Sequence, residues 1–593
     1  MAALFTTPKR NDTTAGTHVA EPDVRRRIGL AHGSWRRVTR RIVAGAVCAL
    51  TVSSLLMPSV SLAAEWVKVG GNKYNTAASD EAGTWSWDGA DDLKLNNYNG
   101  GEIQAAGKLN VNYSGTNIVT AEWIESINVS HGTNENAELN IQGDEGGTLS
   151  VTSTEDAILS TGNINIDGAG SVNATSTGFD AINAGGDLAI KGSGNVNATG
   201  ASDGIRANGN ITIDDSGAVT ARATKDKGIG ADKNLTIKGG GTVEASSADG
   251  EALWSGGNIN ISDGSQVKAN SEEDSAVIST YKLTVTNASL NASGAKYGVH
   301  AFGGVTFDHA TVTVRTSAGG GQAIALFTDW DDIVIKNGST VDAFAEGEVS
   351  AAFSTRNDRP NEKGGHIYIS DSVVKAIARY VENGDGPIPY SENQDGETRR
   401  EPQGENIGII AQTSEGVTPA VISIIRSKVT AEGDTAAIFA RAMSADGKTI
   451  GTIKIENAAI QTPEGGKVID YRKLRDGIYE AGQAIGTGDA TVDSLYIKAV
   501  AKSTTIAPPE VAKPEDPKPD ETKPAESKPA ESKQNPKPEG SKPTKAVAAS
   551  TTKAKTTGVL AATGDTSGAA IVATVLAGTA AIAAGTMASR KRS

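Results

Sequence analysis

Three aspartates lie close together in the segment TDWDD, at Asp329, Asp331 and Asp332. Paired carboxyl groups are what glycoside hydrolysis requires, one on each side of the scissile bond and within about 10 Å of each other. His366 follows in GGH, and the triplet RSK begins at Arg426. Neighbouring side chains on a strand point in opposite directions, which separates Asp331 from Asp332. We therefore expect no catalytic centre here, no cofactor, and a chain that is not an enzyme.

The order of these residues nevertheless resembles that of pectin-degrading hydrolases, which carry Asp pairs, a Gly-His-Gly and an Arg-x-Lys. The spacings and the Gly-His-Gly itself differ in this chain. The triplet FDH at 307–309 resembles a lyase motif still more weakly. The sequence shows no phosphate-binding Gly-rich loop with Lys, no zinc-type Cys/His set and no Gly/Asp calcium repeat. A surface polysaccharide lyase or hydrolase remains the alternative to a binding protein.

The same region offers residues for binding a sugar rather than cleaving it. A sugar site combines flat aromatic faces with carboxylates and amides, and Trp330, Tyr380 and Tyr390 lie in or beside apparent insertions, close to Asp329 and Asp331. A second candidate is an outward row that includes Trp254, Ile278 and His300, in which the two apolar residues are expected to be exposed. The alternatives are that the insertions are merely tolerated and that loops cover the row.

The elements that must position these residues are repeats. Successive apolar positions lie mostly 23 or 24 residues apart in three columns, and such a period indicates stacked supersecondary units. Each unit has three short runs of alternating apolar and polar residues, separated by Gly, Asn and Asp, which suit turns. The columns are Ile166, Ile190, Ile213, Ile237, Ile261, Val285; Val172, Val196, Val219, Val243, Val267, Leu290; and Ile182, Ile205, Ile229, Leu253, Val277, Val299.

Three short strands and three turns per unit predict a parallel β-helix, and thus an all-β chain of about a dozen coils. The pattern resembles known right-handed, three-faced β-helices of the pectin-lyase-like kind, and that resemblance implies the right-handed form. We expect an N-terminal cap at 64–104, the β-helix at 105–462 and a C-terminal cap at 463–503, partly helical over 467–485. Insertions at 328–331, 355–365, 412–420 and 442–450 follow the third run, and another at 380–404 precedes it. Insertions at one corner of stacked repeats often form the binding side.

The C-terminal residues indicate how the protein is anchored to the cell. Residues 504–558 are rich in Pro, Lys, Glu and Ser and predict an unpacked linker. Residues 559–593 contain LAATG, an apolar stretch long enough to span a bilayer as a helix, and a basic end that stays cytoplasmic. This order resembles a sortase cell-wall sorting signal of the LPxTG type, in the Leu-Ala-x-Thr-Gly variant of Gram-positive bacteria. The resemblance makes sortase and peptidoglycan the partners and assigns recognition to Leu560, Ala561, Ala562, Thr563 and Gly564, with cleavage between the last two.

The N-terminal residues and the charge agree with export. Residues 1–63 run from basic to apolar to small residues, as a secretory signal peptide does. The chain of 593 residues has a net charge of −14 although both ends are basic, so its acidic body does not favour nucleic acid. The segment TWSWDGADDLKLNNYNGGEI also resembles the starts of adhesin-like surface proteins of gut Gram-positives. We expect a wall-anchored surface protein that binds glycan or host surfaces, with a passive coat or stalk as a further alternative.

Overall fold

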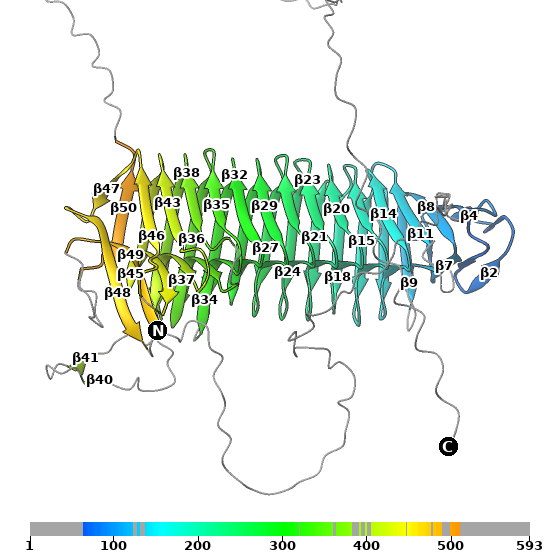
Figure 1. Ribbon diagram of the computed structural model, residues 1–593. Coiled ribbons are helices and arrows are strands. Elements are labelled where there is room, and N and C mark those ends of the chain that lie inside the picture. The colour runs from blue at the N-terminus through cyan, green and yellow to red at the C-terminus, as the bar shows by residue number, and fades with distance from the viewer. Residues whose placement is uncertain are drawn as a thin grey trace, which may run out of the picture. The chain divides into compact units, whose positions relative to one another are not determined.

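The computed structural model describes residues 63–121, 127–130, 137–318, 321–359, 363–381, 391–392, 398–399, 405–445, 447–475, 478–488 and 499–509. These residues belong to the first of two compact units, 1–512 and 513–593. Within the described residues the backbone forms strands and turns and no helix. Long parallel sheets of stacked strands run through them (Figure 1), which is consistent with the predicted β-helix solenoid.

The chain visits three sheets in turn, and we call one pass through sheets A, C and B a coil. For example, β14, β15 and β16 lie in sheets A, C and B, and β17 then returns to sheet A. The strands of sheet A, in spatial order, are β3 (Ala78–Ser79), β4 (Trp85–Trp87), β5 (Asp92–Asn96), β8 (Lys108–Ser114), β11 (Glu138–Gly143), β14 (Asn163–Gly168), β17 (Leu188–Lys191), β20 (Ile211–Asp214), β23 (Leu235–Lys238), β26 (Ile259–Ser262), β29 (Lys282–Thr286), β32 (Gly304–Asp308), β35 (Ile333–Lys336), β38 (Ile367–Ser370), β43 (Val421–Ile425) and β46 (Thr452–Glu456).

Sheet C runs alongside in the same direction. Its strands, in spatial order, are β6 (Asn99–Gly100), β9 (Thr116–Ala121), β12 (Thr148–Ser153), β15 (Ser171–Ser176), β18 (Val196–Gly200), β21 (Ala218–Ala223), β24 (Thr242–Ser247), β27 (Gln266–Ser271), β30 (Ser289–Gly294), β33 (Thr311–Ser317), β36 (Thr340–Gly347), β39 (Val373–Tyr380), β44 (Lys428–Gly433), β50 (Ser503–Ala507) and β47 (Ala459–Thr462).

Sheet B completes each coil. Its pairings connect β2 (Asn72–Tyr74), β1 (Val67–Val69), β7 (Ile103–Ala106), β10 (Ile127–Ser130), β13 (Ile158–Ser160), β16 (Ile182–Ala184), β19 (Ile205–Ala207), β22 (Ile229–Ala231), β25 (Leu253–Ser255), β28 (Val277–Ser279), β31 (Tyr297–Ala301), β34 (Gln322–Thr328), β37 (Val349–Asn357), β42 (Asn406–Thr413), β45 (Ala436–Ser444), β49 (Ile478–Gly486) and β48 (Lys467–Arg475). A separate pair is formed by β40 (Ser391–Glu392) and β41 (Thr398–Arg399).

The predicted columns are confirmed by the strand register. Ile190 pairs with Ile213 and Ile213 with Ile237, and each of the three is at most 1% exposed. The Val172 and Ile182 columns pair in the same manner through sheets C and B. These inward side chains form one continuous hydrophobic core along the stack, so each coil depends on its neighbours for cover.

The turn from sheet A to sheet C explains the Gly, Asn and Asp between the runs. Every positive-φ residue other than glycine among the described residues lies in this turn, for instance Asp215 at φ 47° and Asp263 at φ 57°. Gly168 and Gly192 occupy the equivalent place in earlier coils, with φ of 99° and 80°. Asp, Asn and Gly adopt this left-handed conformation most readily, which is why they recur there.

The two ends of the stack differ from the predicted N-terminal and C-terminal caps. Parallel stacking already begins at β5, β6 and β7, inside the segment assigned to the N-terminal cap, and the antiparallel strands of this end are β1 to β4. Residues 467–475 and 478–486 are antiparallel strands β48 and β49 rather than partly helical, because they extend sheet B beyond β45.

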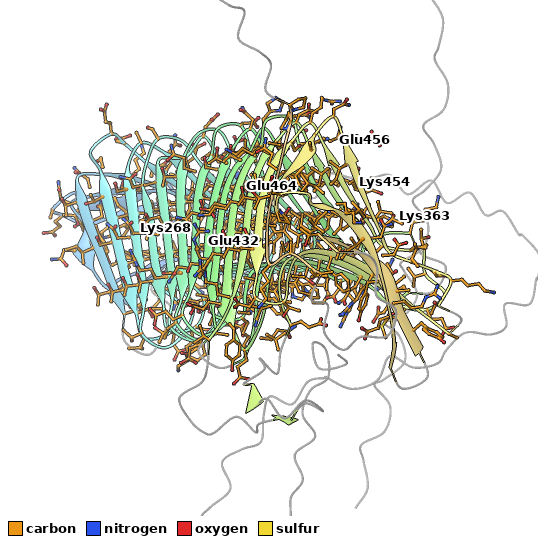
Figure 2. All side chains as sticks on the ribbon, turned by 90° about the vertical axis from the view of Figure 1, so that its left-hand side faces the viewer. Lys268, Lys363, Glu432, Lys454, Glu456 and Glu464 are labelled. Atoms are coloured by element: carbon orange, nitrogen blue, oxygen red, sulfur yellow. The ribbon has the colours of Figure 1, made fainter. Side chains whose placement is uncertain are left out.

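The boundary of the linker at 504 was also wrong. Strand β50 lies between β44 and β47 and pairs antiparallel with both, and its Ile506 is completely buried. Sheet A ends at β46, whose Lys454 and Glu456 are exposed (Figure 2). Charged side chains on such an edge strand disfavour pairing with another chain.

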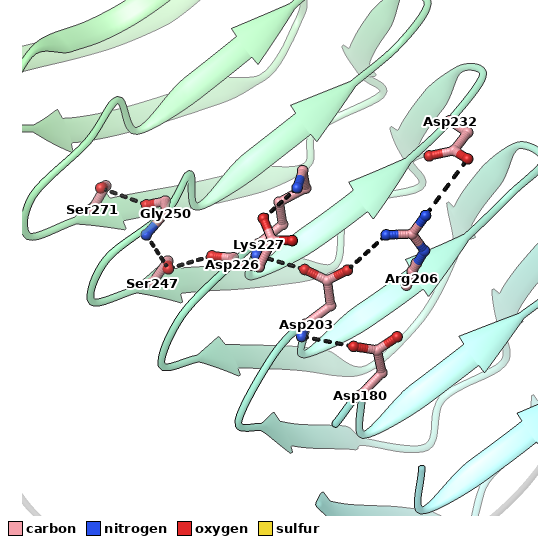
Figure 3. A network of polar contacts seen from close by, with 9 residues as sticks. All are labelled: Asp180, Asp203, Arg206, Asp226, Lys227, Asp232, Ser247, Gly250 and Ser271. Carbon is pink, nitrogen blue, oxygen red and sulfur yellow. Dashed lines mark hydrogen bonds and ion pairs between the residues drawn. The ribbon is translucent and has the colours of Figure 1, made fainter. Parts of the chain in front are cut away.

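The corner between sheets C and B holds a ladder of buried aspartates (Figure 3). The backbone N–H of Asp203 donates to Asp180 Oδ1 at 2.9 Å, and the N–H of Lys227 donates to Asp203 Oδ1 at 2.6 Å. Arg206 Nη1 lies 3.4 Å from Asp203 Oδ2, and Asp226 bonds the Lys227 ammonium. Asp180 and Asp203 therefore each tie one coil to the next.

Burial raises the pKa values of two aspartates in this ladder. It raises the pKa of Asp203 to about 6, with repulsion from Asp226 and Asp180 adding to it and the hydrogen bond from Lys227 opposing it. Burial also raises the pKa of Asp180. A carboxyl whose pKa is higher in the folded state takes up a proton on folding, so its contribution to stability falls as pH rises from about 4 through 6.

We expect Asp203→Asn to reduce this pH dependence. From an unfolded pKa of about 3.9, Asp203 makes the wild type about 1–1.5 kcal/mol more stable at pH 5 than at pH 7. The asparagine keeps an oxygen for the Lys227 N–H but does not titrate, so most of that difference should vanish in urea unfolding of residues 63–509. The control is Asp371→Asn, which removes an exposed partner of Arg426 and should leave the difference in place. An unchanged pH dependence in Asp203→Asn would contradict the assignment.

Candidate functional site

The strands of sheet B become longer along the stack. Its strands from β13 to β28 have 3 residues each, whereas β31 has 5, β34 has 7 and β37 has 9. On these wider strands the outward side is buried as well, in a second hydrophobic cluster that includes Ile324, Phe327, Ile410 and Phe439. The wider coils therefore carry a layer of side chains that the narrower coils lack.

Four insertions gather at one corner, as predicted. They connect β34 to β35, β37 to β38, β42 to β43 and β45 to β46, which places all of them where sheet B turns into sheet A. The strands run slightly further than expected, so the loops are 329–332, 358–366, 414–420 and 445–451. We call these loops the insertion corner. The fifth insertion, between β39 and β42, lies at the other end of the sheet B strands, and Tyr390 within it falls outside the described residues.

A buried ionic cluster supports the insertion corner. Asp329 is 5% exposed, and its two oxygens have separate partners. Oδ2 lies 2.9 Å from His300 Nε2, and Oδ1 accepts a hydrogen bond of 2.9 Å from Arg356 Nη2. These residues come from β31, the start of the 329–332 loop and β37, so the cluster joins three successive coils. Its role is to hold the loop in place, because both oxygens of Asp329 are engaged.

Aromatic rings surround His300. The ring centroid of His300 lies 4.2 Å from that of Phe302, and the centroid of Phe302 lies 5.5 Å from that of Trp330. The Arg359 guanidinium lies over the Trp330 ring, 3.4 Å from its centroid, in a cation–π contact. Trp330 is partly accessible, with the Arg359 guanidinium over its ring and Asp331 next to it in the chain.

Asp331 and Asp332 do point apart. Asp331 Oδ2 lies 2.8 Å from Lys282 Nζ, toward an earlier coil, whereas Asp332 Oδ1 accepts the backbone N–H of His366 at 2.9 Å, toward the next coil. Burial raises the pKa of Asp332 and lowers that of His366, whose Nδ1 accepts the N–H of Val421. Asp332 and His366 thus connect neighbouring coils. Asp331 and Asp332 do not form a carboxyl pair that faces a shared substrate.

Two predicted residues lie elsewhere. Trp254 is in the same outward row as His300, with Ile278 between them, and Lys227 Nζ lies 5.3 Å from its ring centroid. The row is as predicted, but its exposure is not, because Trp254 and Ile278 are half-buried and His300 is buried. Tyr380 ends β39 in sheet C, where its N–H donates to Asp434 Oδ2, so it does not join the insertion corner.

Several residues of this region escaped the sequence interpretation. Tyr281 and Tyr368 are 61% and 37% exposed, and Lys282 and Arg359 contact Asp331 and Trp330. Tyr281 and Lys282 lie at the same corner two coils before the first insertion, and that position was the available signal.

A second ionic cluster, also unforeseen, lies on the outer side of β42 and β45. Arg441 Nη1 is 3.1 Å from Glu405 Oε2 and 3.9 Å from Glu480 Oε2, and Arg441 donates two hydrogen bonds to Gln412 Oε1. Gln412 Nε2, Glu480 Oε2 and Ser354 Oγ are buried and have no hydrogen-bond partner among the described residues. Such atoms are normally satisfied, if need be by ordered water.

One cluster of three carboxylates among the described residues could surround a cation. Asp88, Asp91 and Asp92 offer oxygens within 4.8 Å of one another. Asp88 Oδ1 accepts the N–H groups of Ala90 and Asp92 at 2.8 and 3.1 Å, which accounts for it as a turn residue.

The predicted export and sorting segments lie outside the residues that the structure describes. Leu560, Ala561, Ala562, Thr563 and Gly564 lie in the second unit, and residues 1–62 precede the described range. In the part of the chain that is described, no helix is long and apolar enough to cross a membrane.

Comparisons with models of protein families, with curated proteins and with solved structures found no match for this chain.

Proposed function

We propose that the chain is a surface protein of a Gram-positive bacterium, exported by its N-terminal segment and linked to peptidoglycan by sortase through Leu560–Gly564. Support comes from the order of the terminal segments, in which a pentapeptide, an apolar stretch and a basic end follow a Pro-rich linker. The stacked strands form a right-handed β-helix of about a dozen coils, spaced at about 4.8 Å. Antiparallel strands cap its two ends.

The ligand in this proposal is a glycan, bound at the insertion corner. The observation that carries it is that Trp330, Arg359 and Asp331 lie at the corner where, among the described residues, consecutive coils lengthen, next to the His300–Asp329–Arg356 cluster. The part of the indole that the Arg359 guanidinium leaves accessible supplies apolar surface for a sugar ring. The guanidinium, and the lone pairs of the Asp331 carboxylate that remain beside its contact with Lys282, hydrogen-bond to hydroxyl groups. A preformed arrangement of this kind lowers the ordering cost of binding.

A glycan array with residues 63–509 tests the proposal. We expect a defined set of glycans to be retained, and retention to be lost in Trp330→Ala, because a stacked aromatic ring commonly contributes 10-fold or more to affinity. Trp254→Ala removes the same side chain from the narrow part of sheet B and serves as the matched control. The same samples are assayed for release of reducing ends from the retained glycans, which a hydrolase would produce and a binding protein would not. Silence across the array would favour a passive coat or stalk.

A further inference from the structure

A groove runs across sheet A in the narrow half of the stack, well away from the insertion corner. It has a volume of about 640 Å³ and crosses the outer side of β14, β17, β20, β23 and β26. Five neighbouring strands at about 4.8 Å each give it a length on the order of 20 Å along the stack. The side chains on the floor of the groove are small or short, and the adjacent corner carries no insertion. These floor residues, one from each strand, are Asn165, Ala189, Thr212, Thr236 and Asn260.

One side of the groove is a ladder of side chains at the turn from sheet B to sheet A. The Oδ1 atom of each rung accepts the backbone N–H of the next rung, as from Asn234 to Asn210 at 3.2 Å and from Asn258 to Asn234 at 2.9 Å. The Nδ2 atoms of these two asparagines donate to the same oxygens at 3.1 and 3.2 Å. The rungs are Asn163, Asp187, Asn210, Asn234 and Asn258.

These contacts leave hydrogen-bonding capacity inside the groove. An amide nitrogen has two hydrogens, and within the described residues Asn234 and Asn258 each use one of them in the ladder. The hydroxyls of Thr212 and Thr236, on the floor, have no hydrogen-bond partner among the described residues and both donate and accept. The ladder also fixes the rungs in place, so a ligand would not have to order them.

The charge of the groove is balanced. Its lining contains one carboxylate, Asp187, and one ammonium, Lys191, and every other lining side chain is neutral. Just beyond it, Lys238 Nζ lies 2.9 Å from Asp214 Oδ2, so that pair is neutral as well. A phosphate backbone or a polyanionic glycan finds no cationic row here.

A peptide is disfavoured for a different reason. Extended peptides bind to sheets by adding a strand at an open edge. The strands under the groove pair with neighbours on both sides, so no backbone edge opens into it. The remaining class is a neutral polymer that carries hydroxyl groups at regular intervals.

We propose that this groove binds a neutral linear polysaccharide lying along the stack, one coil after another. This is a second surface, separate from the insertion corner, and it does not depend on the glycan proposed there. No aromatic ring lines the groove, so each coil contributes weakly and the binding depends on several coils acting together.

The experiment is native affinity electrophoresis of residues 63–509 in gels that contain dextran, mannan, mixed-linkage β-glucan or, as an anionic comparison, polygalacturonate. We expect retardation by at least one neutral polymer and none by polygalacturonate. The double variant Thr212→Val/Thr236→Val keeps the shape of both side chains but removes both hydroxyls, and should weaken the retardation about tenfold, because each lost hydrogen bond lowers the affinity several-fold.

The matched control is Thr284→Val/Thr306→Val, which changes the same outward row of sheet A beyond the groove. Thermal melts verify that both double variants are folded. Trp330→Ala should leave the retardation unchanged, which separates this proposal from the insertion corner. The proposal is overturned if no neutral polymer retards the protein, if only polygalacturonate does, or if the groove variant migrates like the wild type. Loss in Trp330→Ala alone would also overturn it and would assign the polymer to the insertion corner.

Discussion

Replacing Arg441 by methionine should destabilise residues 63–509 by about 3–5 kcal/mol, because removing one partner of a buried ionic cluster leaves uncompensated charge. The side chains of Arg441 and Glu480 are 4% and 3% exposed, and Glu405 is 10% exposed. Without the guanidinium, the carboxylates of Glu405 and Glu480 would stay buried and lose their contacts with Arg441. Urea unfolding measures the change.

Arg426→Met is the matched control for this prediction. Arg426 makes two hydrogen bonds to Asp371, at 2.7 and 2.8 Å, but this pair is about half exposed, so its loss should destabilise the protein far less than the loss of Arg441. Combining Arg441→Met with Glu480→Gln should restore at least about 1 kcal/mol of the free energy of unfolding, because the buried charge of Glu480 is removed. Equal effects of the two single arginine variants would show that burial of the Arg441 cluster is not as described.

Thr563→Ala should abolish attachment to the cell wall. By the proposed resemblance, sortase cuts after Thr563 and passes its carbonyl to an amine of the wall precursor, so the reaction has no substrate without that residue. In a Gram-positive host whose sortase accepts Leu-Ala-x-Thr-Gly, the wild type should appear in the fraction released by muramidase, and the variant should stay with the membrane.

Thr557→Ala, six residues upstream and outside the pentapeptide, is the control and should behave like the wild type. Muramidase-released Thr563→Ala in wild-type amounts would refute wall anchoring through this motif. Retention of both proteins in the membrane would mean that the C-terminal segment is a plain membrane anchor.

The stacking of coils could be predicted from the sequence because it depends on a local pattern. Ile190, Ile213 and Ile237 recur at a spacing that only a repeated unit produces, and the alternation around them defines which side faces inward. The common corner of the insertions followed from the same alignment, since four of them came after the third run of successive units.

The ends and the outer layer could not be predicted because they depend on contacts between distant segments. Strand β50 pairs with β44 and β47 from more than forty residues away, and a Pro-rich linker beginning nearby concealed it. The cover over the outer side of sheet B likewise buries His300, which the row pattern places on the outward side of its strand. Arg441 reaches Glu405 and Glu480 across different strands, and no periodicity marks such a cluster.

The most direct test of the account is isothermal titration of residues 63–509 with the glycan that the array retains most strongly. We predict that Trp330→Ala and Asp331→Asn each weaken the affinity at least about tenfold while Trp254→Ala leaves it unchanged. Equal affinity in all four proteins, or a loss confined to Trp254→Ala, would contradict a glycan site at the insertion corner.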